Sequence, residues 1–311
     1  MIRFLLRRLV GLLLTVLAAV VLTFVANQFV PGDPVTVMLG DQSANRALAD
    51  KLRAEYGLDR PVLAQFAGYV AGLLRGEMGL SFRFPGTTVA AVIADGLAIS
   101  PLIAGAALLI AAPLGVALGI FAALRRGSLG DTGVMLVLVA GLSIPNFAMA
   151  ALLVWLFSIK LAWLPVAGWG RPIHAVLPVV LLAIPATAYL ARLARTFMLE
   201  VLQQDYMRTA RAKGLAERLV VWRHGLRNVL LPILTVLGVI LGGLITGTFV
   251  VETLFNIPGL GRIAIQSIFA RDYPVTMGIV MLFTLLYAAI SFAVDVLYGV
   301  IDPRVRVGGG R

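Results

Sequence analysis

The 311-residue chain is 60% hydrophobic and only 13% charged, with a mean hydropathy of +0.97. A soluble domain carries about 25% charged residues, so this chain has too few charges to cover a water-facing surface. It has 26 Lys and Arg against 15 Asp and Glu, but these lie between long apolar runs, which is not typical of nucleic-acid-binding proteins. The absence of cysteine excludes a disulfide framework, a thiol nucleophile and a thiolate metal site. Much of the chain must therefore face lipid.

The first apolar run, residues 9–29, follows Arg3, Arg7 and Arg8. A helix needs about 20 apolar residues, at about 1.5 Å each, to cross the hydrocarbon core of a bilayer. The run is longer than the apolar region of a signal peptide, about 7–15 residues, and no convincing cleavage site follows it. We therefore predict a retained membrane helix.

Residues 31–98 differ in character from this run. Pro31-Gly32-Asp33-Pro34 ends the first helix, and short helices are predicted over residues 48–56, ended by Gly57, and over residues 61–74. We expect a folded loop outside the bilayer.

Further apolar runs follow, and with the first they predict an all-α integral membrane protein of six spans: residues 99–124, 134–159, 176–190, 229–251 and 275–297. In a membrane bundle, neighbouring helices can satisfy the carbonyls freed by prolines, which here are Pro113, Pro145, Pro178, Pro185 and Pro232. A group of glycines is predicted to allow close helix packing, with a backbone lining a pathway as the alternative: Gly238, Gly242, Gly243 and Gly247.

The distribution of Lys and Arg predicts the orientation. With the amino terminus in the cytoplasm, six spans return the carboxyl terminus there, and the loop at 31–98 is external. The segments then on the cytoplasmic side hold 16 Lys and Arg against 5 acids, whereas the external segments hold 10 against 9; the cytoplasmic ones are 1–8, 125–131, 191–228 and 302–311.

The sequence lacks the residue patterns that several kinds of chemistry require. The two histidines, His174 and His224, lie outside the apolar runs, and no His-Glu-x-x-His or Gly-x-Ser-x-Gly pattern indicates an intramembrane hydrolase. Asp295 is the only acid within a predicted span, and its position at one end favours structural pairing over ion coupling, although its role stays open.

The chain also lacks a phosphate-binding loop. Such a loop needs Gly-Lys-Ser/Thr, and none of the three lysines, Lys51, Lys160 and Lys213, follows a glycine. If ATP drives this protein, another polypeptide must supply the ATPase site.

The longest predicted cytoplasmic loop, residues 198–228, contains a short helical segment. Asp205 is predicted to cap its start, and Gly214 to adopt the left-handed conformation after Lys213 in the last turn. A helix of about two turns is not stable alone, so packing must hold it. Beyond it, apolar residues at steps of three and four predict an amphipathic helix: Leu215, Leu219, Trp222, Leu226 and Val229.

At this point the sequence resembles a known family. Arg208-Thr209-Ala210-x-x-x-Gly214 is similar to the "EAA" loop of ABC importer permeases, with Arg and Thr in place of the first two letters. The sequence also resembles the oligopeptide/dipeptide branch of this family in further motifs. These are Arg223-His224-x-Leu226-Arg227-Asn228-x-Leu230-Leu231-Pro232, Pro31-Gly32-Asp33-Pro34, Val251-Glu252-Thr253-Leu254-Phe255, Pro258-Gly259-Leu260-Gly261, Arg271-Asp272-Tyr273-Pro274 and Asp302-Pro303-Arg304. One departure is Arg227, which stands where the general ABC pattern has a proline.

The resemblance implies a permease subunit in a bacterial or archaeal cytoplasmic membrane, one transmembrane domain over residues 1–311. Its implied partners are membrane lipid, a second permease, one or two ATP-binding subunits carrying ATP and Mg²⁺, and an extracytoplasmic binding protein, with no nucleic acid and no cofactor of its own. The implied coupling helix would fit a groove on the ATP-binding subunit through Asp205, Tyr206, Arg208, Thr209, Ala210, Arg211, Lys213, Gly214 and Leu215.

The cargo implied by the resemblance is a dipeptide or oligopeptide, with nickel, glutathione or a glycoside as alternatives within the family. An ion-coupled secondary transporter or channel, and an intramembrane enzyme, are the alternatives from other classes.

Overall fold

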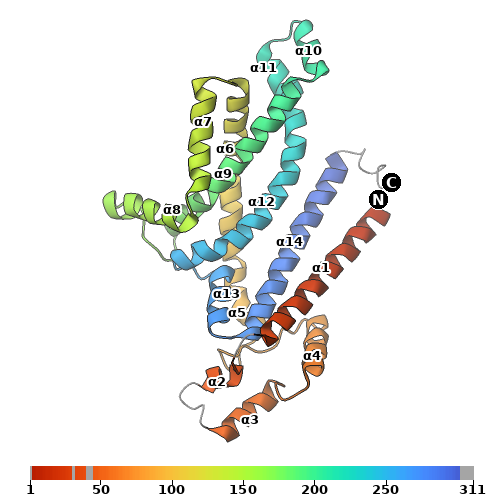
Figure 1. Ribbon diagram of the computed structural model, residues 1–311, viewed down its shortest axis with the longest axis vertical. Coiled ribbons are helices and arrows are strands. Elements are labelled where there is room, and N and C mark those ends of the chain that lie inside the picture. Colours follow the sequence, from red (N-terminus) through yellow and green to blue (C-terminus); the bar gives the residue numbers. More distant parts are fainter. Residues whose placement is uncertain (1, 30–31, 40–44, 302–311) are drawn as a thin grey trace. The chain divides into compact units, whose positions relative to one another are not determined.

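The computed structural model describes residues 2–29, 32–39 and 45–301, and these residues form helices with one isolated β-bridge between Leu80 and Thr88 (Figure 1). The predicted all-α fold is confirmed. The contacts divide the chain into two compact units: unit 1 is Pro101–Ile257 with the chain from Ala289 onward, and unit 2 is Ile2–Ser100 with Pro258–Ala288. The single domain over residues 1–311 stays a prediction.

Most of unit 1 is a set of long helices joined by short ones: α6 (Ile99–Leu124), α7 (Leu129–Ser143), α8 (Asn146–Leu153), the π-helical segment η2 (Val154–Lys160), α9 (Ile173–Leu202), α10 (Asp205–Ala212), α11 (Glu217–Leu219), the π-helical segment η3 (Val220–Leu226) and α12 (Arg227–Leu254). Unit 2 contains α1 (Ile2–Gln28), α2 (Pro34–Leu39), α3 (Arg46–Glu55), α4 (Val62–Leu74), α5 (Val89–Leu97), α13 (Leu260–Phe269) and most of α14 (Tyr273–Ile301).

The number of spans agrees with the sequence prediction. Among the described residues, five stretches are long and apolar enough to cross a membrane: Arg8–Gln28, Val89–Leu124, Ile173–Leu202, Glu217–Leu254 and Tyr273–Val294. A sixth results if the bent pair Leu129–Ser143 and Asn146–Lys160 counts as one span.

The bent pair corrects the prediction of one continuous helix over residues 134–159. Its two halves meet at 105°, and Figure 1 shows α8 turned away from the line of α7. Pro145 cannot donate a backbone hydrogen bond and forces Ile144 out of the helical region, to φ −83° and ψ 121°. At about 1.5 Å per residue, neither half alone reaches across a hydrocarbon core of about 30 Å.

The other four prolines named in the sequence analysis stay within helices: Pro113 in α6, Pro178 and Pro185 in α9, and Pro232 in α12. The predicted span 176–190 is shorter than the helix that contains it. This helix, α9, continues through Arg192, Arg195 and Glu200 and is 30 residues long.

Close helix packing in unit 1 depends on glycines of α6 as well as on those predicted. A Cβ atom on Gly119 would lie 2.4 Å from the carbonyl oxygen of Ala191, and α9 lies equally close to Gly115. Of the predicted glycines, Gly238 approaches a side chain of α14, with an added Cβ only 2.1 Å from Val294 Cγ2. Gly243 has no such neighbour within 4 Å, so close packing is confirmed at Gly238 and not at Gly243.

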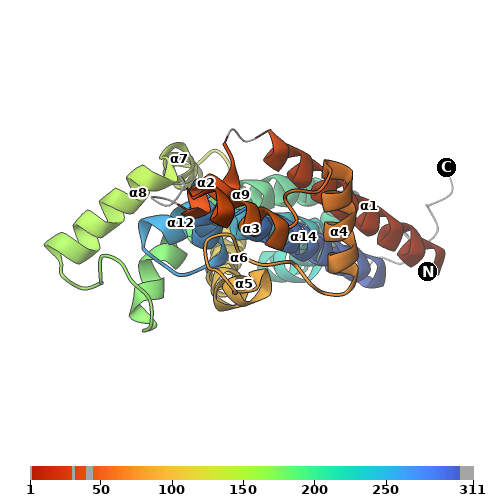
Figure 2. The same ribbon diagram turned by 90° about the horizontal axis from the view of Figure 1, so that it is seen from below.

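In unit 2, segments far apart in the sequence meet around Asp272, which is 1% exposed. Its carboxylate accepts hydrogen bonds from the Ser81 hydroxyl, from Phe82 N at 3.0 Å and from Arg83 N at 3.2 Å. This fixes the loop before α5 to the turn between α13 and α14. Within the same unit, α2 lies beside α3 (Figure 2).

Candidate functional site: the segment 205–215

The predicted short helix is present as α10, and its limits follow from local chemistry. Gln204 is the N-cap and makes no side-chain cap, so the prediction that Asp205 is the cap is wrong. Asp205 is instead the first helical residue, where the positive end of the helix dipole still stabilises a carboxylate. Lys213 is the C-cap, and Gly214 has φ +74°, which confirms the left-handed position.

One face of α10 is packed inside its own chain. Met207 is 0% exposed and Ala210 5% exposed, and both cluster with Val220 at the start of η3. Three half-buried residues cover this cluster: Val201, Leu202 and Leu215. This packing supplies the stability that an eight-residue helix lacks alone, and it attaches α10 to the end of α9 and to η3.

The same packing changes the role predicted for Ala210. The resemblance implied that Ala210 contacts the ATP-binding subunit, whereas the structure buries it against Met207 and Val220. Gly225 serves this inner face too: an added Cβ would lie 3.0 Å from Met198 Cε and 3.5 Å from Met207 Cε.

The outer face of α10 is exposed and polar. Its predicted site residues are Asp205, Tyr206, Arg208 and Thr209, followed by Arg211, Lys213 and Gly214. Thr209 bonds only within the helix, its hydroxyl donating to Asp205 O at 3.0 Å. Arg208 lies 3.7 Å from the Asp205 carboxylate, and both side chains are largely exposed, so this pair contributes little to stability.

Two outer residues are already paired within the chain. Arg211 donates to both carboxylate oxygens of Glu217, at 3.0 and 2.8 Å, and this carboxylate raises the pKa of the guanidinium. The Tyr206 hydroxyl accepts a hydrogen bond from Asn228 Nδ2 at 3.1 Å. These contacts hold α10 against the chain that leads into α12, and they leave Arg208 and Lys213 as its outward cations.

The amphipathic helix predicted after α10 has a different buried face. Leu219 and Trp222 are 42% and 61% exposed, whereas Val220, Val221 and Gly225 are buried. The reason is the π-helical geometry of η3, in which each turn contains more residues and the buried positions shift. The spacing that predicted Leu219 and Trp222 on the inner face assumed an α-helix.

An ion pair that the sequence did not reveal joins α7 to α9. Arg195 donates to both oxygens of Asp131, from Nε at 2.8 Å and from Nη2 at 2.7 Å, and Asp131 is 5% exposed. The same carboxylate accepts from Gly127 N at 3.1 Å. The Asp131 carboxylate therefore fixes the α6–α7 turn to α9. The sequence placed this residue only within the charged segment 125–131.

Both histidines lie in the part of the chain that the structure describes. His174 has its ring Nδ1 3.2 Å from Arg171 O, and His224 lies half-buried in η3. No group of His, Asp or Glu among the described residues has the arrangement of a metal site. The side chain of Asp295 and the segment Asp302-Pro303-Arg304 lie outside the part that the structure describes.

The geometry is that of a helical membrane protein with a short helix anchored at the junction of two long ones, and comparison with known proteins gives its family. Residues 115–307 match the binding-protein-dependent transport system inner membrane component family, and residues 1–87 match the N-terminal family of such membrane components. The chain belongs to this family of ABC importer permeases.

Relatives match along almost their whole length. The dipeptide transport system permease protein DppB of Bacillus subtilis is 39% identical over 99% of this chain and 99% of its own. The glutathione transport system permease protein GsiC of Escherichia coli K12 is 39% identical over 98% of this chain and 99% of its own.

Solved structures show the same fold at low sequence identity. An inward-facing MetNI methionine ABC transporter chain has a TM-score of 0.57 and 18% identity, covering 68% of this chain and 96% of that chain. An amino acid ABC transporter chain has a TM-score of 0.52 and 19% identity, covering 67% and 92%.

Proposed function

We propose that this protein is the membrane subunit of an ABC importer for short peptides, and that residues 205–215 contact its ATP-binding subunit. The observation that carries the proposal is the two-sided construction of α10. Its inner face is packed on α9 and η3, and its outer face presents exposed polar groups. A displacement applied to the outer face would therefore reach two long helices directly.

The names of the relatives support a peptide as cargo. The Bacillus protein is named for dipeptides and the Escherichia protein for glutathione, itself a short peptide, and each is 39% identical to this chain. Uptake of dipeptides, glutathione, nickel and a glycoside by one reconstituted importer separates the alternatives. We expect the dipeptides to be transported.

We propose the remaining assembly from the family and from charge. A second permease completes the path, an external binding protein delivers the cargo, and one or two ATP-binding subunits supply hydrolysis with ATP and Mg²⁺. Both termini are cytoplasmic, and residues 31–98 lie outside the membrane. Reporter fusions near Asp50 should read external and fusions at Gly214 cytoplasmic; the reverse result contradicts this orientation.

The contact is tested by reversing the outward charges of α10. Arg208→Glu and Lys213→Glu leave the packed face intact, so the chain should retain its thermal stability in detergent. We propose that Arg208 and Lys213 meet acidic groups of the ATP-binding subunit. In the reconstituted complex, ATP hydrolysis stimulated by the loaded binding protein should therefore fall about tenfold, because like charges at a contact are costly. Arg218→Glu makes the same change at another exposed position, outside residues 205–215, and should have little effect. Normal stimulation in both test variants would contradict the proposal.

ATP dependence separates this function from an ion-coupled transporter. Uptake should require ATP and persist with a protonophore, whereas uptake that the protonophore abolishes would favour ion coupling.

A further inference from the structure

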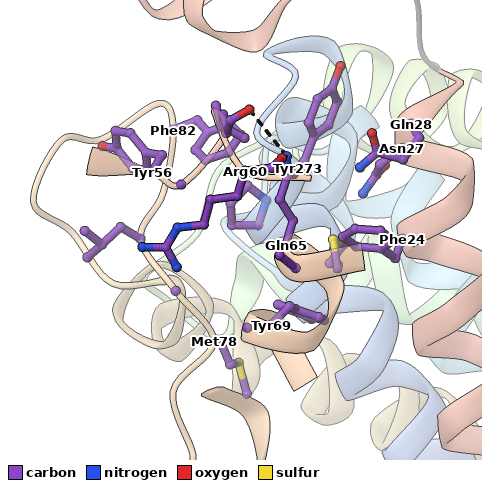
Figure 3. A pocket seen from close by; sticks show the side chains of 18 of the residues that line it. Phe24, Asn27, Gln28, Tyr56, Arg60, Gln65, Tyr69, Met78, Phe82 and Tyr273 are labelled. Atoms are coloured by element: carbon purple, nitrogen blue, oxygen red, sulfur yellow. Dashed lines mark hydrogen bonds between the residues drawn. The ribbon is translucent and has the colours of Figure 1, made fainter. Parts of the chain in front are cut away.

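Unit 2 contains a cavity of about 380 Å³ that the function described so far does not use (Figure 3). This lies within the range of about 300–1,000 Å³ typical of small-molecule sites. Three parts of the chain surround it: the end of α1, the segment from Glu55 to Phe82 that includes α4, and the start of α14. In Figure 3, Phe24, Asn27 and Gln28 of α1 lie on one side, and Tyr56 and Phe82 on the other.

The cavity is a built feature, because its walls are fixed from behind. The rings of Tyr56 and Phe82 pack edge to face with centroids 5.1 Å apart, and Phe82 packs against Tyr273 at 6.1 Å. Asp272 holds Ser81 and Phe82 by hydrogen bonds. On the α1 side, Phe24 packs against Phe66 of α4 at 5.1 Å.

Three polar atoms of the lining residues are buried without a hydrogen-bond partner among the described residues: Asn27 Nδ2, Tyr69 OH and Tyr273 OH. Buried polar groups in proteins are nearly always paired, so each such atom needs an explanation. The three atoms belong to lining residues of α1, α4 and α14, and a ligand that enters between these side chains would complete them.

The polar and apolar groups that line the cavity indicate which kind of ligand would fit it. The amide nitrogen of Asn27 is a donor, and burial raises the pKa of Tyr69 to about 12, so its hydroxyl also remains a neutral donor. These groups match carbonyl oxygens. The apolar walls of Phe24, Met277 and Phe82 match an uncharged side chain, and the exposed Glu55 and Arg60 supply one charge of each sign at the edge.

We propose that this cavity binds a short peptide that carries an apolar side chain, with the peptide carbonyls accepting from Asn27, Tyr69 and Tyr273. The inference rests on the proposed function, because it adds to a peptide importer a peptide site on the permease itself. A phospholipid in this cavity, or water alone, is the competing occupant.

The first experiment measures binding without transport. The complete importer is illuminated with the dipeptide Ala-photoleucine, and labelled positions are found by mass spectrometry. Labelling within residues 55–82 that excess Ala-Phe suppresses is the expected result. Within the permease chain, labelling only outside residues 55–82, or labelling suppressed by phospholipid and not by Ala-Phe, overturns the inference.

The second experiment removes one hydroxyl. Tyr69→Phe keeps the ring and should raise the Ala-Phe concentration for half-maximal uptake about three- to tenfold, as loss of one hydrogen bond predicts, with little change in maximal rate. Its thermal stability should be equal to or above that of the unmodified protein, because an unpaired buried hydroxyl is removed. Tyr287→Phe makes the same change at a residue that is 49% exposed and should alter neither quantity.

The two experiments separate failure of the inference from failure of the function. If uptake by the Tyr69→Phe variant is normal and residues 55–82 are not labelled, the cavity is not a peptide site. This result would not contradict the proposed importer function. Specific labelling without ATP-dependent uptake overturns the proposed function and leaves the site.

Discussion

The α10 segment of unit 1 and the cavity of unit 2 treat their polar groups in opposite ways. In α10, Met207 and Ala210 are buried, and the polar side chains are exposed or paired, as Arg211 is with Glu217. Among the lining residues of the cavity, two hydroxyl groups and one amide group are buried with no hydrogen-bond partner in the described part of the chain. An exposed, prearranged polar face suits contact with another protein, whereas buried unpaired donors suit a small ligand that brings acceptors. The two regions should therefore respond differently to substitution.

The largest effect is expected at the inner face of α10. Ala210→Glu would place a carboxylate where the side chain is 5% exposed and packed on Val220, and burial of an unpaired charge is strongly unfavourable. We expect a clear loss of thermal stability in detergent and more than about a tenfold loss of stimulated ATP hydrolysis. Ala212→Glu makes the same change at an exposed position of the same helix and should keep the stability. Equal stability of the two variants would show that α10 is not packed as described.

The next effect is expected at the support of the cavity. Asp272→Ala would leave the Ser81 hydroxyl and the Phe82 and Arg83 amides without their acceptor, at a cost of about 3 kcal/mol in unfolding free energy. The loop before α5 should become more sensitive to limited proteolysis, and peptide labelling of the cavity should decrease. Asp59→Ala, at an exposed residue of the connection between α3 and α4, is the control. Unchanged proteolysis of the Asp272 variant would contradict its role as a support.

A smaller effect is expected at the end of α10. Gly214→Val forces a β-branched residue to φ +74°, which costs about 1–2 kcal/mol. No side chain surrounds this glycine within 4 Å, so the cost is one of backbone strain and not of steric overlap. Stimulated ATP hydrolysis should fall while the amount of protein in the membrane stays normal. Ala216→Val, at φ −57°, should retain stimulation; if both variants behave alike, the left-handed turn is not required.

The smallest effect is expected for the outer ion pair. Arg211→Gln removes the contact with Glu217, but these side chains are 39% and 59% exposed, and such pairs contribute about 0–1 kcal/mol. Chemical denaturation in detergent should show a change within this range, decreasing further at high salt. A loss comparable to that of Ala210→Glu would mean that the outer pair, and not the packed face, holds α10.

The sequence by itself determined the features that depend on local chemistry and on bilayer thickness. A crossing helix needs about 20 apolar residues, so run lengths alone predicted six spans, and five or six are found. The turn at Gly214 followed in the same way, because a left-handed residue is specified within one turn of a helix.

Tertiary structure decided what depends on neighbours. Of the five prolines named in the sequence analysis, only Pro145 separates two helices. Whether a helix continues through a proline depends on which nearby groups replace the lost hydrogen bond. The burial of Ala210 depends on its packing with Val220, at the start of a segment whose π-helical geometry no periodicity revealed. The cavity joins Asn27, Tyr69 and Tyr273, and residues so distant in the chain come together only through packing.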